Sequence, residues 1–206
     1  RLAGDYWQVP AIVGIERVPT SDEMKHFGAA LASYGSVALF HMAGITPEAR
    51  RLDEVLAPGH TVRSHEVGEA DVRAFQESYA AAIETIDVVV FSAPQLSLIE
   101  MAQVAGMLAG RRAKIPLLVV TSPQVKGDAD RMGLTARIEE AGGTVLSGMC
   151  FYQSYAREMA EANGWRRLAT NSAKLVNIVG GYGYRPALMS MPACIDAACS
   201  GGRIAP

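Results

Sequence analysis

The stretch IDVVVFSAPQLSLIE, residues 86–100, combines an apolar run, a polar end and the start of a helix. Residues 86–91 are predicted to form a central parallel strand, because an apolar run bounded by polar residues is typical of a strand covered on both faces. Ser97 and Glu100 have the spacing of a capping box, which predicts that a helix begins there. The stretch therefore predicts a β-α unit with polar residues at the carboxyl end of its strand.

The same order of elements recurs along the chain. Predicted strands start at regular intervals, near residues 36, 61, 86, 115, 144 and 166. Helical segments lie between most of them, and alternating strands and helices favour an α/β fold with a layered, mostly parallel, doubly wound sheet. We expect residues 1–18 to be an irregular lead-in and residues 19–206 to form a single α/β core.

Composition limits the class of partner. The chain has 206 residues, of which 50% are hydrophobic, and a formal net charge of −2. It has no basic stripe of the kind that binds nucleic acid, and no apolar run of the roughly 18 residues that a membrane span needs. Three widely spaced cysteines do not make a disulfide framework, which favours a reducing compartment. We therefore expect a cytoplasmic protein that binds neither nucleic acid nor membrane.

Polar clusters follow several predicted strands. Because the carboxyl ends of parallel strands share one edge, these residues are expected to converge on one pocket. Helix N-termini at that edge direct backbone N–H groups toward a carboxylate or phosphate. A single junction of this kind is more often an ordinary helix cap, but three together favour a pocket for an anionic ligand. The candidates are Ser92, Thr121, Ser122, Asn171 and Ser172, with Lys174 just beyond them.

Two further polar residues allow alternative interpretations. His41 ends a predicted buried strand, so it is either a core histidine bonded to backbone or a ligand-binding residue. Lys25 lies on a predicted helix and could pair with a substrate carboxylate, although a lysine there is more often solvated. The residues alone do not decide between these roles.

The cysteines can be structural thiols or metal ligands. Cys150 follows a strand on the presumed binding edge, and Cys194 and Cys199 lie near the end of the chain. Their spacing does not match a structural zinc site. Three thiolates can hold an iron–sulfur cluster with one iron position open to substrate, but spacing alone favours buried structural thiols. The motifs of dinucleotide-binding, P-loop, serine-hydrolase and zinc-protease sites do not occur in the sequence.

Six ordered blocks of the chain, taken together, resemble a signature of the aconitase X family. They are Gly28-Ala29-Ala30-Leu31, Phe40-His41-x-x-Gly44-Ile45-Thr46-Pro47-Glu48, Ser92-x-Pro94-x-x-Ser97-x-x-Glu100, Thr121-Ser122, Cys150 and Asn171-Ser172-Ala173-Lys174. The resemblance covers residues 12–203. It implies an aconitase-superfamily fold and an iron-dependent hydro-lyase, a dehydratase of a small hydroxylated carboxylate such as cis-3-hydroxy-L-proline. Archaeal relatives act on mevalonate 5-phosphate.

The resemblance also implies the parts of a site. The cofactor would be an iron–sulfur cluster, for instance 2Fe-2S, or a mononuclear iron, with Cys150 and Cys194 as ligands and Cys199 outside the matched positions. The substrate pocket would be formed by Ser92, Thr121, Ser122, Asn171, Ser172, Lys174, His41 and Lys25. Where the family often reads Ser-Pro-His-x-Ser, this chain has Pro94-Gln95-Leu96-Ser97, so a histidine contact is absent or the substrate preference is altered.

The family's large catalytic part is longer than this chain and works with a small swivelling part that supplies a serine base. We therefore expect residues 1–206 to be the C-terminal half of the large part. The catalytic base and a third metal ligand would then lie in the remaining half and the small domain or subunit, which are the expected partners. Two alternatives stay open: a non-catalytic α/β subunit or remnant that lacks the metal, and an anion-binding or nucleotide-binding α/β domain.

Overall fold

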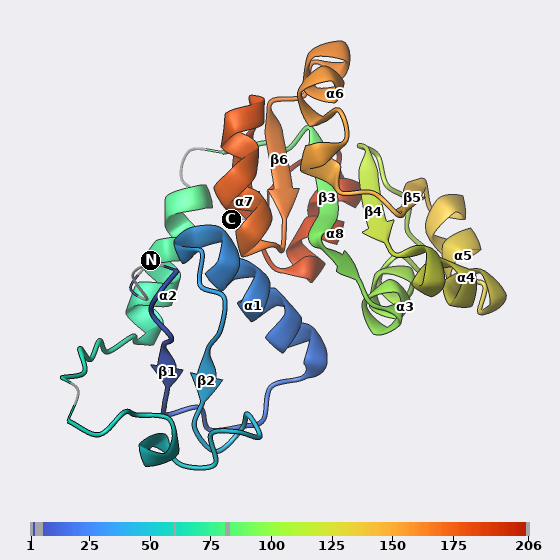
Figure 1. The fold of residues 1–206 in the computed structure, drawn as a ribbon. Helices are drawn as coiled ribbons and strands as arrows, with labels where there is room; N and C mark the ends of the chain where they lie inside the picture. Colours follow the sequence, from blue (N-terminus) through green and yellow to red (C-terminus); the bar gives the residue numbers. More distant parts are fainter. Residues whose placement is uncertain (1, 3–5, 60, 81–82, 205–206) are drawn as a thin grey trace. The chain divides into compact units, whose positions relative to one another are not determined.

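The computed structural model describes residues 2, 6–59, 61–80 and 83–204 (Figure 1). The chain divides into two compact units, Arg1–Glu69 and Ala70–Pro206. Whether both units serve one catalytic segment, as the sequence suggests, stays a prediction. No helix in the described ranges has the length and apolar character that crossing a bilayer requires.

The second unit is built on a five-stranded sheet with the strand order β5-β4-β3-β6-β7, and all its pairs are parallel. The strands are β3 (Val88–Leu96), β4 (Leu117–Thr121), β5 (Gly143–Ser147), β6 (Arg167–Thr170) and β7 (Arg185–Leu188). The strand predicted at residues 86–91 is the central one. The predicted α/β fold with a doubly wound parallel sheet is confirmed.

Helices cover both faces of this sheet (Figure 1). Val89 and Phe91 of β3 face a core shared with α3 (Leu98–Met107), α4 (Pro123–Arg131), α5 (Leu134–Glu140) and α8 (Met191–Ser200). Val88 and Val90 face a second core shared with α6 (Ala156–Asn163) and α7 (Ala173–Val179). This alternation explains why residues 88–91 of β3 are all apolar, since a strand segment buried on both faces has no polar side.

The predicted capping box opens α3, where Ser97 accepts a hydrogen bond from the Glu100 N–H at 3.1 Å. The sequence pattern of residues 128–141 predicts a single helix, which is wrong because α4 and α5 are separate. Gly133 lies between them with a φ of 68°, a left-handed conformation that glycine adopts without strain. The sequence likewise predicts a helix over residues 152–163, but a 3₁₀ turn, η2 (Phe151–Gln153), precedes the shorter α6.

The first unit has less regular structure. It contains α1 (Ser21–Gly35), a 3₁₀ turn at Leu52–Glu54, and two short strands, β1 (Ala11–Ile12) and β2 (His41–Met42), which pair in parallel. Thr20 and Glu23 have the spacing of a capping box in the sequence, and this capping box opens α1. The helix α2 (Glu69–Ala80) follows, with its first residue in this unit.

Three predictions for the first unit are wrong. The strand expected at residues 36–41 is reduced to His41–Met42. Residues 61–67 form no strand, and the helix that Thr46-Pro47-Glu48 predicts, with proline at its first position, does not form. For residues 61–67 the physical reason is a lack of burial. Val62 and Val67 are 54% and 58% exposed, so no packed face stabilises an extended conformation there.

Candidate functional site

The candidate site lies where the direction of the chain reverses in the sheet of the second unit. From β3 the chain passes through α3 to β4 on one side, whereas from β6 it passes through α7 to β7 on the other side. β3 and β6 are neighbours, so their carboxyl ends flank the point where the two connections diverge. In open α/β sheets this crevice is the usual place for a ligand.

Hydrogen bonds hold the ends of these two strands together. The Ser172 hydroxyl donates to the Ala93 carbonyl and accepts from the Leu175 N–H at 3.0 Å. The Thr170 hydroxyl accepts from the Ser172 N–H at 3.2 Å. Ser172 is completely buried, so its hydroxyl fixes the end of β3 against the start of α7 rather than contacting solvent.

A third junction meets this edge through Gln95. Its side-chain amide donates to the Met149 carbonyl at 2.9 Å, which ties the segment after β5 to the end of β3. Sequence reasoning noted Gln95 only as the residue in place of a family histidine. The contact spans 54 positions in the sequence, so no local pattern could have revealed it.

Ser92 differs from the other hydroxyl groups at this edge. It is 1% exposed, and its hydroxyl has no hydrogen-bond partner among the described residues. By the alternation of β3, its side chain lies on the same face as those of Val88 and Val90. A buried polar group without a partner costs about 1–3 kcal/mol. The Ser92 hydroxyl therefore has hydrogen-bonding capacity that the described residues do not use.

Thr121 and Ser122 reach the same edge, but their hydroxyls already bond to the protein. The Thr121 hydroxyl is buried and donates to the Leu96 carbonyl at 2.7 Å, where the register between β3 and β4 shifts. The Ser122 hydroxyl accepts from the Val125 N–H at 3.2 Å as the cap of α4. For these two residues the structure shows the capping and bracing role that the sequence left open.

The side chains of Asn171 and Lys174 keep unused hydrogen-bonding capacity. Both are partly buried, and neither side chain makes a hydrogen bond or ion pair with the described residues. Lys174 lies in the first turn of α7, next to the Ser172 cap. An ammonium group here gives the carboxyl edge a positive charge that a carboxylate ligand can use.

Lys25 and His41 belong to the first unit. The Lys25 ammonium lies 3.1 Å from a carboxylate oxygen of Asp22. Nδ1 of His41 lies 2.7 Å from Oε1 of Glu48, a contact that lowers the pKa of Glu48. His41 is thus bonded to a carboxylate and not to backbone through this atom. Their role in a substrate pocket stays a prediction.

The two predicted iron ligands occupy different surroundings. Cys194 is completely buried in the core that contains Val89, and burial raises the pKa of its thiol far above the usual range. Cys150 is partly buried and immediately precedes Phe151, which belongs to the core on the opposite face of the sheet. The described residues contain no group of three His, Cys, Asp or Glu side chains that could hold a metal ion. The residues present therefore do not complete an iron site.

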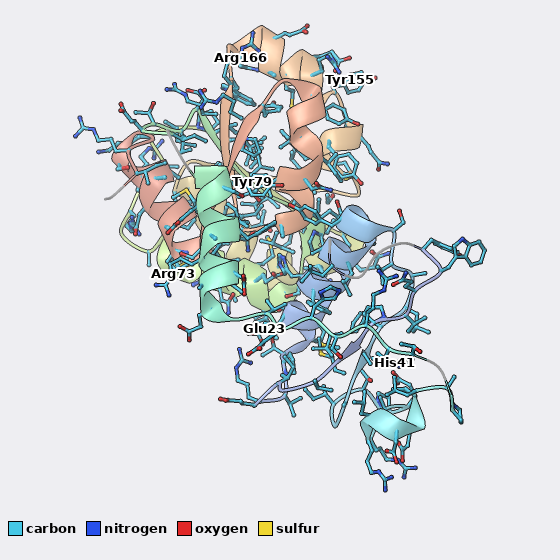
Figure 2. The ribbon with its side chains drawn as sticks, turned by 90° about the vertical axis from the view of Figure 1, so that its left-hand side faces the viewer. Glu23, His41, Arg73, Tyr79, Tyr155 and Arg166 are labelled. Atoms are coloured by element: carbon cyan, nitrogen blue, oxygen red, sulfur yellow. The ribbon has the colours of Figure 1, made fainter. Side chains whose placement is uncertain are left out.

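An open pocket of about 640 Å³ follows Cys150, a feature that the sequence did not predict. Tyr152, Tyr155 and Tyr182 line it together with Arg157. Burial, together with the neighbouring Cys150 thiol, raises the pKa of Tyr152. Tyr155 is 76% exposed and has a φ of 61°, which is uncommon for a residue with a side chain (Figure 2).

Comparison with known proteins gives consistent matches. Residues 1–77 match the family model of the aconitase X second domain, and residues 86–200 match that of the third domain. Cis-3-hydroxy-L-proline dehydratase of Pseudomonas aeruginosa is 35% identical over 202 residues, which are 94% of this chain and 34% of that protein. The phosphomevalonate dehydratase large subunit of Methanocaldococcus jannaschii is 33% identical over 156 residues, 76% of this chain and 37% of that protein.

A solved structure agrees with these matches. The crystal structure of Thermococcus kodakaraensis aconitase X in its holo-form aligns with a TM-score of 0.81 and 30% sequence identity. The alignment covers 95% of this chain and 48% of that chain. The chain thus spans less than half the length of each of these relatives.

Proposed function

The chain belongs to the aconitase X family, and from this we propose that the carboxyl edge of β3 and β6 binds the substrate of a hydro-lyase. Both curated relatives compared above are named dehydratases. Because the chain spans 34% of the first and 37% of the second, the proposal concerns the complete protein. The observation that carries it is the buried, unpartnered hydroxyl of Ser92 at the point where the sheet connections diverge.

We propose cis-3-hydroxy-L-proline as the substrate. The Pseudomonas dehydratase of this compound aligns with 94% of the chain, whereas the Methanocaldococcus large subunit aligns with 76%. The compound is a small hydroxylated carboxylate, which suits an edge with one unpartnered hydroxyl and one partly buried ammonium. Phosphomevalonate is the alternative substrate, and the experiment below includes it.

The reaction requires a proton and a hydroxyl group to leave neighbouring carbons. A base takes the proton from C2, the C2–C3 double bond forms, and the C3 hydroxyl leaves with a second proton as water. The product of this step is an enamine, because its C2–C3 double bond lies next to the ring nitrogen. Transfer of the proton from nitrogen to C3 converts it to a pyrroline carboxylate. Negative charge grows on the substrate carboxylate as the C2 proton departs, and donors fixed in place stabilise such charge effectively.

In our proposal two side chains of this chain share that task. The Lys174 ammonium pairs with the substrate carboxylate and orients it. The Ser92 hydroxyl donates a hydrogen bond to the oxygen on which charge develops. Ser172 is a positioning residue, because its hydroxyl holds the Ala93 carbonyl and thereby the end of β3. The base that takes the C2 proton is expected outside these residues.

We keep iron as a proposal for the complete protein only, with Cys150 and Cys194 as two ligands and a third from outside the described residues. Iron content of the purified complete protein tests it. Replacing Cys150 with serine should remove the iron, whereas the matched Cys199→Ser variant should retain it. Equal iron in both variants would contradict the assignment of Cys150. Unmodified complete protein without iron and without turnover would instead favour the non-catalytic alternative.

Steady-state kinetics of the complete protein test the substrate site. Ser92→Ala should lower kcat/KM for cis-3-hydroxy-L-proline by about 100-fold, the typical effect of losing one donor to a developing charge. Lys174→Met should mainly raise KM. The control is Ser200→Ala, which removes a hydroxyl that bonds the Ala197 and Arg203 carbonyls at the far end of α8. Equal kcat/KM in the Ser92 and Ser200 variants, or turnover of phosphomevalonate alone, would contradict the proposal.

A further inference from the structure

The sheet of the first unit has two edges that differ in their hydrogen bonding. β1 and β2 pair with Ala11 opposite His41 and Ile12 opposite Met42. The His41 N–H donates to the Pro10 carbonyl at 2.9 Å, and the Ala43 N–H donates to the Ile12 carbonyl at 3.0 Å. Because successive residues of a strand direct their backbone groups to opposite sides, those of Ala11 and Val13 point away from β2.

The outer edge of β2 is closed by its own turn. The Met42 N–H donates to the Thr46 hydroxyl at 3.1 Å, and the Thr46 N–H donates to the Met42 carbonyl at 2.9 Å. These two bonds satisfy the backbone groups that a neighbouring strand would otherwise use. No further strand can therefore pair at Met42 without displacing the turn.

Among the described residues of the first unit, none pairs with the outer edge of β1. The backbone groups of Ala11 and Val13 make no hydrogen bond within the described part of the chain. Val9, Val13 and Ile15 lie along the same segment and are 48%, 57% and 42% exposed. An exposed strand edge with apolar side chains pairs readily with another strand, and proteins normally cover or charge such edges. Within the first unit, the described residues add no strand at this edge and no charged residue between Val9 and Ile15.

We propose that β1 accepts a third strand from a part of the aconitase X polypeptide outside these 206 residues. The strand would be extended and apolar at alternate positions, so that it covers Val13 while its backbone bonds Ala11 and Val13. The proposal rests on family membership and on the geometry of this edge, and it is independent of the proposed substrate.

Two arguments favour this occupant over a second copy of the chain. About two-thirds of the curated Pseudomonas relative lies outside the match, which leaves ample polypeptide to supply a strand (the match covers 34% of it). A strand of the same protein is present at high effective concentration. By contrast, two copies joined through strands of two residues would bury far less than the roughly 1,200 Å² typical of a stable interface.

Amide hydrogen exchange of the complete protein, resolved to single residues, tests the proposal. The Ala11 and Val13 amides should exchange at least about 100-fold more slowly than unstructured amides, as expected for bonded groups. The Ala43 amide, which bonds Ile12 in any case, is the internal standard. Exchange of Ala11 and Val13 at unstructured rates beside a protected Ala43 would overturn the proposal. Protection that disappears on dilution would also overturn it, in favour of pairing between copies.

A matched pair of variants gives a second test in the complete protein. Val13→Asp places a charge on the open edge, whereas Val62→Asp places the same charge on a side chain of similar exposure, 54%, outside any strand. Val13→Asp should lower the melting temperature and raise Ala11 exchange at least tenfold. Val62→Asp should leave Ala11 exchange unchanged. Equal effects of the two variants on Ala11 exchange would contradict strand addition.

Discussion

The two units of the chain differ in how far their apolar side chains are buried. In the second unit both faces of a five-stranded sheet are covered, and Val88, Val89, Val90 and Phe91 of the central strand are completely buried. In the first unit the buried apolar residues among those described are Val37, Met42 and Ala49. Several large apolar residues there are exposed, among them Trp7, Val9, Val13, Val18 and Leu39. The second unit contains its own extensive core, whereas the described residues of the first unit bury few apolar side chains among themselves.

Truncation of an apolar side chain should show the largest difference between the units. Phe91→Ala removes a fully buried ring from the core and should lower the free energy of unfolding by about 3–5 kcal/mol. Leu39→Ala, at 52% exposure, should cost less than about 1 kcal/mol. Urea unfolding can follow each unit separately, because Trp7 lies in the first and Trp165 in the second. Comparable losses for both variants would remove the contrast.

The packing of the second unit can be examined at two adjacent glycines. Gly201 and Gly202 have φ values of 82° and 87°, so an alanine is strained at either position. A Cβ at 202 would lie 2.2 Å from the Ile86 carbonyl oxygen, whereas a Cβ at 201 meets nothing within 4 Å. Gly202→Ala should therefore cost more than about 3 kcal/mol and Gly201→Ala about 1–2 kcal/mol. Equal melting temperatures for the two variants would show that this contact is not tight.

An ion pair at the amino end of the sheet gives the second unit a specific pH dependence. Burial raises the pKa of Asp87, but hydrogen bonds from the Arg167 side chain and from the Arg166 and Arg167 N–H groups outweigh it, so the net shift is downward. A lowered folded pKa stabilises the protein above the unfolded value near 3.9, and this contribution is lost as the pH falls through the folded value.

Asp87→Asn should therefore destabilise the second unit by about 1.5–3 kcal/mol at pH 7, the usual range for hydrogen bonds to a charged group. The difference from the unmodified chain should shrink below pH 4, as measured by urea unfolding with Trp165 fluorescence. A difference that stays constant from pH 7 to pH 3 would contradict the role of the Asp87 charge.

The smallest effect is expected for an ion pair in the first unit. The Arg17 guanidinium donates to Glu23 at 2.8 Å, and this bond, with the Thr20 N–H, lowers the pKa of Glu23 to about 2. Both side chains are exposed, so water and salt screen the pair. Glu23→Gln should change the melting temperature less than Asp87→Asn does, and 1 M salt should reduce its effect further. A salt-independent effect as large as that of Asp87→Asn would reverse the comparison.

The sequence predicted the second unit far better than the first. The apolar run of residues 86–91 and the capping box of Ser97 and Glu100 identified β3 and α3, because a doubly buried strand and a helix cap both have strong local signals. β7 and α8 were missed. β7 contains Pro186, which is tolerated on an edge strand but weakens a strand pattern, and α8 is rich in small residues with no clear periodicity.

The sequence predicted where the candidate residues lie along the sheet, but not which hydrogen bonds each side chain makes. The rule that the carboxyl ends of parallel strands share an edge predicted Ser92, Ser172 and Lys174 at one sheet edge, and β3 and β6, which precede them or contain them, are parallel neighbours. It could not show that the Thr121 hydroxyl is used by the Leu96 carbonyl while that of Ser92 stays unpartnered, because these bonds depend on a register shift in β3. It also could not show that Cys194 points into a core.

The central claim is that the carboxyl edge of β3 and β6 receives the substrate carboxylate. A crystal structure of the complete protein with bound cis-3-hydroxy-L-proline tests it most directly, through the distance from Ser92 Oγ to the nearest ligand oxygen. We predict a hydrogen bond of about 2.5–3.0 Å, with Lys174 Nζ beside the carboxylate. A ligand bound elsewhere, with the Ser92 hydroxyl still unpartnered, would contradict the account.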